Sequence, residues 1–149
     1  MAMSAKRLQK RINLYPPYLG AGVRVVHMSE DCRAIEVEMP LRWWNRNYVG
    51  THFGGSLYSM TDPFYMIMLI HNLGPEYTVW DKSATIRFKR PGKGTMSARF
   101  ELTPGRIEEI RAAADRGEKV EPLFQVLVMD SEGNVVAEVE KLLWVKRKD

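Results

Sequence analysis

The residues most able to do chemistry lie together in the middle of the chain. A glycine pair, Gly54-Gly55, precedes an apolar run over residues 57–73, and Asp62 is the one acidic residue in that run. Backbone N–H groups at a helix start are unpaired and lie at the positive end of the helix dipole, so they suit a developing oxyanion. Glycine lets a substrate approach that backbone. A nearby carboxylate can activate water as a general base or act as a nucleophile itself.

The apolar run predicts one long helix. Because its residues are apolar on nearly every side, the helix is expected to be buried on every side, with Asp62 buried inside it, and it is too short to cross a membrane. A second interpretation of Asp62 stays open. Asp followed directly by Pro63 is typical of a helix start, in which case the carboxylate would cap the backbone instead of serving water.

The spacing between the two chemical groups predicts more than one chain. Asp62 follows Gly55 by seven residues, which is about 10 Å along a helix axis and on nearly the same face. One helix therefore cannot place both groups around a single carbonyl carbon. Two antiparallel helices related by a twofold axis can, so we expect a homodimer in which one chain supplies the donors and the other supplies Asp62.

Most of the remaining chain shows the period-two alternation of strands, with turn residues between them. A short helix over residues 4–15 is expected to stop at Pro16-Pro17, and a surface helix is expected after Thr103-Pro104. Strict alternation from Trp80 would place Trp80 and Phe88 on the same face of a strand. The predicted strands cover residues 22–28, 32–39, 80–90, 96–102, 123–130 and 135–146.

These elements predict a single α+β domain over residues 1–149. A curved, mostly antiparallel sheet would wrap around the long central helix, with a small extra surface helix and a basic N-terminal helical segment at residues 1–18.

That order of elements, with the spacing of Asn47, Gly50, Gly54-Gly55 and Asp62, resembles the hotdog fold. Within it, the chain is most similar to the acyl-CoA thioesterases of the phenylacetate-pathway type, whose motif has Asn, Gly, a His-Gly-Gly and Asp at this spacing. The resemblance implies an acyl-CoA substrate and a site shared by two chains. It also implies Asp62 as the base, Gly54 and Gly55 as oxyanion donors, and Asn47 as a group that orients the water or the Asp. Asn47 has an alternative role, which is to hold the backbone of its own loop.

Two departures separate the chain from that motif. Phe53 stands where the family has His, with His52 one residue early, and Pro63 follows the Asp directly. A neighbouring hotdog group of unknown function has similar Gly-Thr-His-Phe-Gly-Gly and Asp-Pro-Phe segments. The departures favour an alternative function, that of a non-catalytic acyl-CoA or acyl-carrier binding protein that kept the fold.

Further residues could contact the substrate. His52 and Phe53 adjoin the glycine pair, although a structural hydrogen bond is the competing role for His52. Arg87, Lys89 and Arg90 form a basic cluster near a strand end, where they could bind the phosphates of CoA. An exposed, solvated turn is the competing interpretation of that cluster.

Composition limits the other functions. The net charge is only +4 over 149 residues and the acidic residues are spread throughout, so we expect no nucleic-acid partner. No zinc-ligand spacing, P-loop or dinucleotide motif is present, so we expect no metal and no cofactor apart from the CoA of the substrate. The N-terminus has no apolar signal region and Cys32 is the only cysteine, which predicts a cytoplasmic protein with no membrane partner. Whether dimers pair into tetramers stays open.

Overall fold

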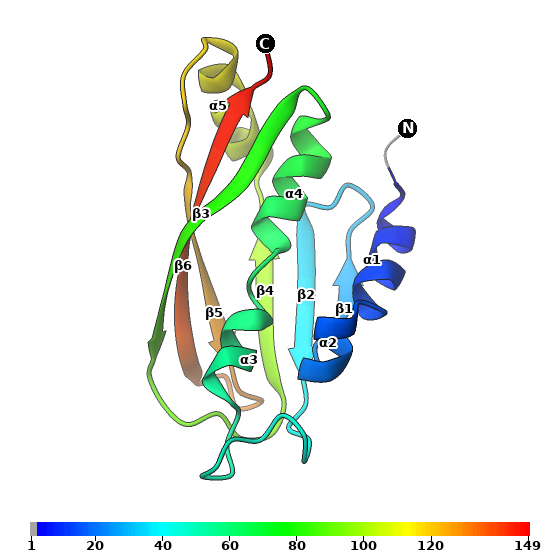
Figure 1. Cartoon of the computed structure of the whole chain (residues 1–149), viewed down its shortest axis with the longest axis vertical. Helices are drawn as coiled ribbons and strands as arrows, with labels where there is room; N and C mark the ends of the chain where they lie inside the picture. Colours follow the sequence, from blue (N-terminus) through cyan, green and yellow to red (C-terminus); the bar gives the residue numbers. More distant parts are fainter. Residues whose placement is uncertain (1–2) are drawn as a thin grey trace.

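A computed structural model describes residues 3–149 and shows one curved, six-stranded sheet (Figure 1). The strand order is β1-β2-β4-β5-β6-β3, and every neighbouring pair is antiparallel. The strands are β1 (Arg24–Met28), β2 (Ala34–Met39), β3 (Tyr77–Phe88), β4 (Met96–Glu101), β5 (Leu123–Met129) and β6 (Val135–Arg147).

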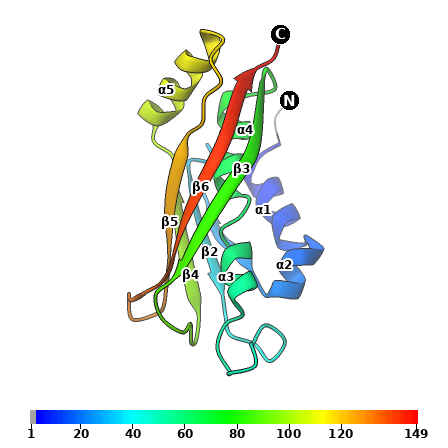
Figure 2. The same cartoon turned by 60° about the vertical axis from the view of Figure 1, so that its left-hand side comes forward.

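The helices occupy three places around this sheet. α3 (Gly54–Ser59) and α4 (Phe64–Leu73) follow each other along its concave face. α1 (Ala5–Asn13) and α2 (Pro16–Ala21) lie beside β1, and α5 (Pro104–Asp115) lies at one end (Figures 1 and 2). Thr103 caps α5 by accepting the N–H of Arg106 at 3.2 Å. The arrangement confirms the predicted α+β class, with a curved antiparallel sheet wrapped around central helical structure.

Alternating apolar residues of the sheet pack against α4. On β2, Ile35, Val37 and Met39 are buried, while the intervening residues are partly exposed. The ring of Phe64, at the start of α4, lies 4.8 Å from the ring of Phe100 on β4. Burying a side chain of this size stabilises the fold by about 1.5–3 kcal/mol. The period-two pattern therefore identifies the inner face of these strands correctly.

The central helix is interrupted, which corrects the single unbroken helix predicted over residues 57–73. α3 ends at Ser59 and α4 begins at Phe64. Pro63 has no N–H to donate to the carbonyl of Ser59, four residues earlier, and its ring obstructs a continuing helix. That carbonyl accepts the Tyr18 hydroxyl at 2.9 Å. Asp62 consequently lies in a short connecting segment and not inside a helix.

The N-terminal part differs from the prediction in its boundaries. Pro16-Pro17 end the first helix as expected, but they also begin α2, because proline is well suited to the first helical positions. Gly22 terminates α2 with a φ of 80°, so β1 starts at Arg24 and not at residue 22. Cys32 is buried in the turn before β2, with a φ of 53°, and not in the strand itself. Residues 1 and 2 of the predicted segment lie outside the described residues.

A β-bulge in β3 changes which of its side chains face the helices. The register with β6 shifts between Asp81 and Ser83, so Lys82 is the extra residue. A one-residue bulge reverses the alternation from one side of it to the other. Trp80 therefore lies on the opposite face from Phe88, contrary to the strict alternation predicted, and Asp81 faces inward.

β3 is also a free edge of the sheet. It is 12 residues long and exposed over most of its length. On the central helix, Ile70 is 47% exposed, so a single chain does not bury this helix on every side as expected. A long free edge can pair with a strand of a second chain. These features favour the predicted homodimer, which stays a prediction for a structure of one chain.

Candidate functional site

The loop that leads into α3 is held by the side chain of Asn47. Its Nδ2 donates to the Thr51 hydroxyl at 2.9 Å and to the His52 carbonyl at 3.2 Å. Its Oδ1 accepts the N–H of Thr51 at 2.9 Å. Asn47 thus holds the backbone of its own loop, the alternative role considered for it. A direct contact between Asn47 and a water or Asp62 stays a prediction.

His52 is buried beneath this loop, and its ring makes a structural hydrogen bond. Its Nε2 lies 2.7 Å from the carbonyl oxygen of Gly94, which requires Nε2 to carry the proton. Burial lowers the pKa of His52, although the bond to the Gly94 carbonyl acts in the opposite direction. With the side chain only 2% exposed, the imidazole supports the loop, and its predicted contact with substrate stays untested.

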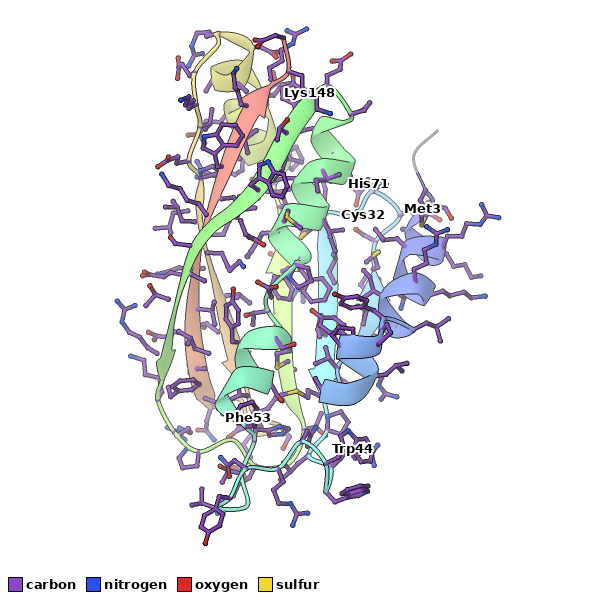
Figure 3. The ribbon with its side chains drawn as sticks, in the orientation of Figure 1. Met3, Cys32, Trp44, Phe53, His71 and Lys148 are labelled. Carbon is purple, nitrogen blue, oxygen red and sulfur yellow. The ribbon has the colours of Figure 1, made fainter. Side chains whose placement is uncertain are left out.

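Gly54 and Gly55 are the first two residues of α3, and neither N–H has a hydrogen-bond partner within residues 3–149. Aromatic rings lie close to both. A Cβ atom at Gly55 would be 2.5 Å from the ring of Phe53, and one at Gly54 would be 3.0 Å from the ring of Phe88. Figure 3 shows Phe53 at the start of α3. The two donors are therefore free, and a substrate that reaches them must pass beside two exposed rings.

A cleft of about 690 Å³ opens beside the glycine pair. It brings Asn47, His52 and Gly54 together with Lys89 and Arg90, which follow β3. Apolar side chains and three cations share its walls, a combination that suits an amphipathic ligand with an anionic end. Its other lining residues are Val49, Thr51, Leu57, Phe88, Pro91, Gly92 and Lys93.

The basic residues near the end of β3 do not all reach this cleft. Arg87 lies on the outer face of the sheet, where it pairs with Glu140 at 3.5 Å. Side chains alternate along β3, so Arg87 points away from the face that Phe88 occupies. The structure thus separates Arg87 from the other residues predicted to bind substrate.

Lys89 and Arg90 reach the cleft because β3 ends at Phe88 and the chain turns there. Lys89 also pairs with Glu138 at 3.1 Å. Within residues 3–149, Arg90 and Lys93 form no ion pair. The turn therefore offers at least two cations that are available to an anionic ligand.

Asp62 lies on the segment between α3 and α4, and its Oδ1 accepts two hydrogen bonds. The Tyr58 hydroxyl and the Lys141 ammonium each donate to it at 2.7 Å. α4 has no side-chain cap, so the capping interpretation of Asp62 is wrong. The Asp62 side chain is 47% exposed, in contrast to the buried carboxylate expected from the apolar run.

The sequence analysis missed three residues of this cluster, Tyr58, Asp81 and Lys141, and Lys141 is the one that contacts all the others. Its side chain is only 1% exposed, and its Nζ also lies 3.2 Å from Asp81 and donates to the Tyr58 hydroxyl at 3.1 Å. The sequence feature that could have revealed it is the alternation of β6, which turns Val139, Lys141 and Leu143 toward the core. A lysine at a position where the pattern requires an apolar residue marks a local conflict, and such conflicts concentrate at functional sites.

The contacts within this cluster keep Lys141 charged and Tyr58 neutral. Burial alone would lower the pKa of Lys141, but hydrogen bonds to Asp62 and Tyr58 outweigh it and raise the pKa. Burial and the bond to Asp62 raise the pKa of Tyr58, so its hydroxyl keeps its proton and donates it. One ammonium, two carboxyl groups and a neutral phenol therefore meet at the point where the central helix is interrupted.

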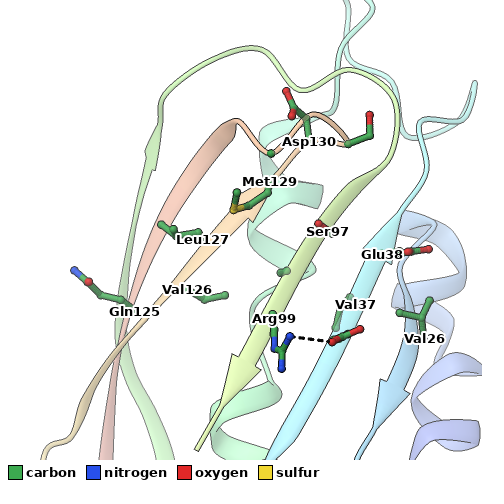
Figure 4. Close-up of a pocket in the computed structure, with 14 residues that line it drawn as sticks. Val26, Val37, Glu38, Ser97, Arg99, Gln125, Val126, Leu127, Met129 and Asp130 are labelled. Carbon is green, nitrogen blue, oxygen red and sulfur yellow. Dashed lines mark ion pairs between the residues drawn. The ribbon is translucent and has the colours of Figure 1, made fainter.

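A second cavity, of about 720 Å³, lies on the outer face of the sheet across β1, β2, β4 and β5 (Figure 4). Arg99 and Glu36 form an ion pair across it at 3.5 Å. α3 and α4 lie on the opposite face of the sheet, and none of the candidate residues lines this cavity. The candidate site is therefore the cleft beside Gly54.

Two features are absent from the described part of the chain. No helix there combines the length and the apolar character needed to cross a membrane. No group of three or more His, Cys, Asp or Glu side chains among residues 3–149 is placed to hold a metal ion.

Solved structures share this architecture. The chain is similar to PA5026 from Pseudomonas aeruginosa, a protein of unknown function described as a probable thioesterase, with 22% identity, 99% of each chain covered and a TM-score of 0.88. It is similar to the thioesterase HI1161 from Haemophilus influenzae at 16% identity, over 99% of this chain and 93% of that chain, with a TM-score of 0.72. It is also similar to the E. coli PaaI protein of the phenylacetic acid degradation operon, at 18% identity, over 99% of this chain and 97% of that chain, with a TM-score of 0.64. These likenesses confirm the predicted hotdog fold.

The family follows from the sequence itself. Residues 5–145 match the model of a domain of unknown function (DUF4442), and the chain belongs to this family. Among curated proteins, none matches the chain. The membership agrees with the resemblance to a neighbouring hotdog group of unknown function.

The raised pKa of Lys141 predicts how stability depends on pH. Because the folded-state pKa lies above the ordinary value of 10.5, the pairing contributes fully below pH 10.5 and is lost as the pH rises through the folded-state pKa. We expect the unfolding free energy of the wild type, relative to that of Lys141→Met, to be constant up to about pH 10.5 and to fall as the pH rises above it. Urea denaturation of both proteins measures this difference, and a difference that does not change with pH would contradict the pairing.

Proposed function

We propose that the protein is an acyl-CoA thioesterase whose site is shared by two chains. The observation that carries the proposal is the pair of unpaired N–H groups at Gly54 and Gly55 beside a cleft lined with available cations. Asp62 supplies a partly exposed carboxylate with one oxygen held in place. The likeness to solved structures described as thioesterases supports the same activity.

The reaction needs only a base and an oxyanion site. Water gives a proton to Asp62 as it attacks the thioester carbonyl carbon. The negative charge that moves to the carbonyl oxygen is stabilised by the N–H groups of Gly54 and Gly55. When the intermediate collapses, the C–S bond breaks and the CoA sulfur leaves with the proton from Asp62. The products are a carboxylic acid and free CoA, and Asp62 is again a carboxylate.

The two halves of the site belong to different chains in this proposal. Asp62 does not line the cleft that contains Gly54 of its own chain. Asp62 follows Gly55 by seven positions and lies beyond the end of α3, while Gly55 lies at its start. A twofold axis beside the free edge of β3 would bring Asp62 of one chain to the glycine pair of the other. Whether such dimers form tetramers stays open, as does the cytoplasmic location.

A non-catalytic acyl-CoA or acyl-carrier binding protein is the second candidate. The rings of Phe53 and Phe88 lie against the glycine pair, and Oδ1 of Asp62 is already occupied by two donors. Such a protein would hold the thioester in the same cleft without cleaving it. Binding of acyl-CoA with no release of thiol would favour this function over hydrolysis.

The catalytic assignment predicts the effect of Asp62→Asn. Asn cannot take a proton from water, so kcat for thiol release from a panel of acyl-CoAs should fall by about 10²–10⁴-fold. Asn also cannot neutralise Lys141, so the unfolding free energy should fall by about 1–3 kcal/mol. Asp115→Asn is the matched control, because it removes an ion pair with Arg147 far from the site. Wild-type turnover in Asp62→Asn would show that another group is the base.

The available cations predict how CoA is held. Arg90→Ala and Lys93→Ala should raise KM for acyl-CoA, since each lost charged contact costs about 1–3 kcal/mol, and should leave acyl-pantetheine unaffected. Arg87→Ala removes a cation from the outer face of the same strand and should change neither KM. Steady-state kinetics with both substrates test this. Equal effects on the two substrates would remove Arg90 and Lys93 from the nucleotide site.

A further inference from the structure

Lys141 is the least expected residue in the core. Its side chain is 1% exposed, and its ammonium donates to Oδ1 of Asp62 and to the hydroxyl oxygen of Tyr58 and forms an ion pair with Oδ1 of Asp81 at 3.2 Å. The packing of β6 does not require a cation, because Val139 and Leu143 flank it on the same face and are fully buried. An apolar side chain would fit the packing there, but it would leave Asp62 and Asp81 without their cation, and removing one partner of a buried ion pair is normally destabilising.

We propose that Lys141 is a positioning residue for hydrolysis, one that fixes Oδ1 of Asp62 and leaves Oδ2 to receive the proton from water. The inference rests on the proposed function, because it gives Asp62 the role of base. It goes beyond that function by assigning a part of the mechanism to a strand residue 79 positions away in sequence.

The contacts distinguish the two oxygens of Asp62. Oδ1 accepts from both Lys141 and Tyr58, each at 2.7 Å. Within residues 3–149, no side chain or backbone group donates to Oδ2. A carboxylate held through one oxygen cannot rotate freely about its Cβ–Cγ bond. The unoccupied oxygen then keeps one direction.

Asp62 needs such a restraint because its backbone does not provide one. It lies between α3 and α4, outside both helices, and its side chain is 47% exposed. Tyr58 alone would restrain it through a single hydroxyl on the short helix α3. Lys141 connects it to β6, a 13-residue strand paired on both sides. Asp81, turned inward by the bulge at Lys82, forms a second ion pair with the ammonium at 3.2 Å.

Four proteins test the inference: the wild type, Lys141→Met, Asp62→Asn and the double variant. Met has the length of lysine without its charge. We expect kcat of Lys141→Met to fall by roughly 10- to 100-fold with KM within about twofold of the wild type, since small misplacement of a catalytic group has this effect. We expect its melting temperature to fall, because Asp62 and Asp81 lose their cation, so the rates are compared at a temperature where all four proteins are folded. In the Asp62→Asn background, Lys141→Met should lower the residual rate no further, because Lys141 acts through Asp62.

Each other outcome has a definite meaning. If Lys141→Met lowers kcat by the same factor in both backgrounds, Lys141 does not act through Asp62 and the inference is overturned. If its kcat equals that of the wild type, the inference is overturned while the proposed function stands. A wild type that releases no thiol from any acyl-CoA overturns the proposed function and the inference together. Lys146→Met, an exposed lysine on the same strand, is the control for loss of a lysine.

Discussion

The interruption of the central helix at Pro63 is the constraint on which the candidate site depends. In a continuous helix, Asp62 would take part in the i to i−4 hydrogen bonds of the backbone, and its side chain would lie among apolar neighbours. Because Pro63 has no N–H, the helical hydrogen bond to the Ser59 carbonyl is missing, and the Tyr18 hydroxyl donates to that carbonyl instead. The short segment between α3 and α4 can then turn Asp62 toward the sheet. Pro63, one of the two departures from the thioesterase motif, thus places the carboxylate outside both helices.

Two strands of the sheet also place charged side chains beside Asp62. The bulge at Lys82 turns Asp81 to the inner face, opposite a lysine that the alternation of β6 also turns inward. Burying an ammonium costs several kcal/mol unless it is paired and hydrogen-bonded, and here two carboxyl groups and a phenol do so. The cluster joins α3, the connecting segment, β3 and β6, so the central helical structure and the sheet meet at a polar contact inside an otherwise apolar core.

Sequence patterns predicted the parts of the fold that depend on local regularity. The inner faces of β2 and β4 follow from alternation alone, and the cap and proline of α5 were readable from Thr103-Pro104. The hotdog class followed from the order of elements with the spacing from Asn47 to Asp62. The glycine loop was expected from residue type and position, and of the predicted basic cluster Lys89 and Arg90 line its cleft whereas Arg87 does not.

The parts that could not be predicted depend on contacts between distant segments. The bulge in β3 is a property of its pairing with β6, and Lys82 resembles any other strand lysine in sequence. Lys141 was visible as a charge at an apolar position, but its partner Asp62 is 79 residues away and nothing local connects them. The Asp-Pro pair allowed both a cap and a free carboxylate, and only the position of Lys141 distinguishes the two.

The central claim is that the glycine donors and Asp62 of one active site come from different chains, and subunit complementation tests it most directly. Gly54→Pro deletes one donor at a helix position where proline is tolerated, and Asp62→Asn deletes the base. Each variant alone should be nearly inactive. Refolded together in equal amounts, they should form mixed dimers with one intact site each, which gives about a quarter of wild-type activity if subunits pair at random. Activity that stays at the level of the two parents would contradict a shared site.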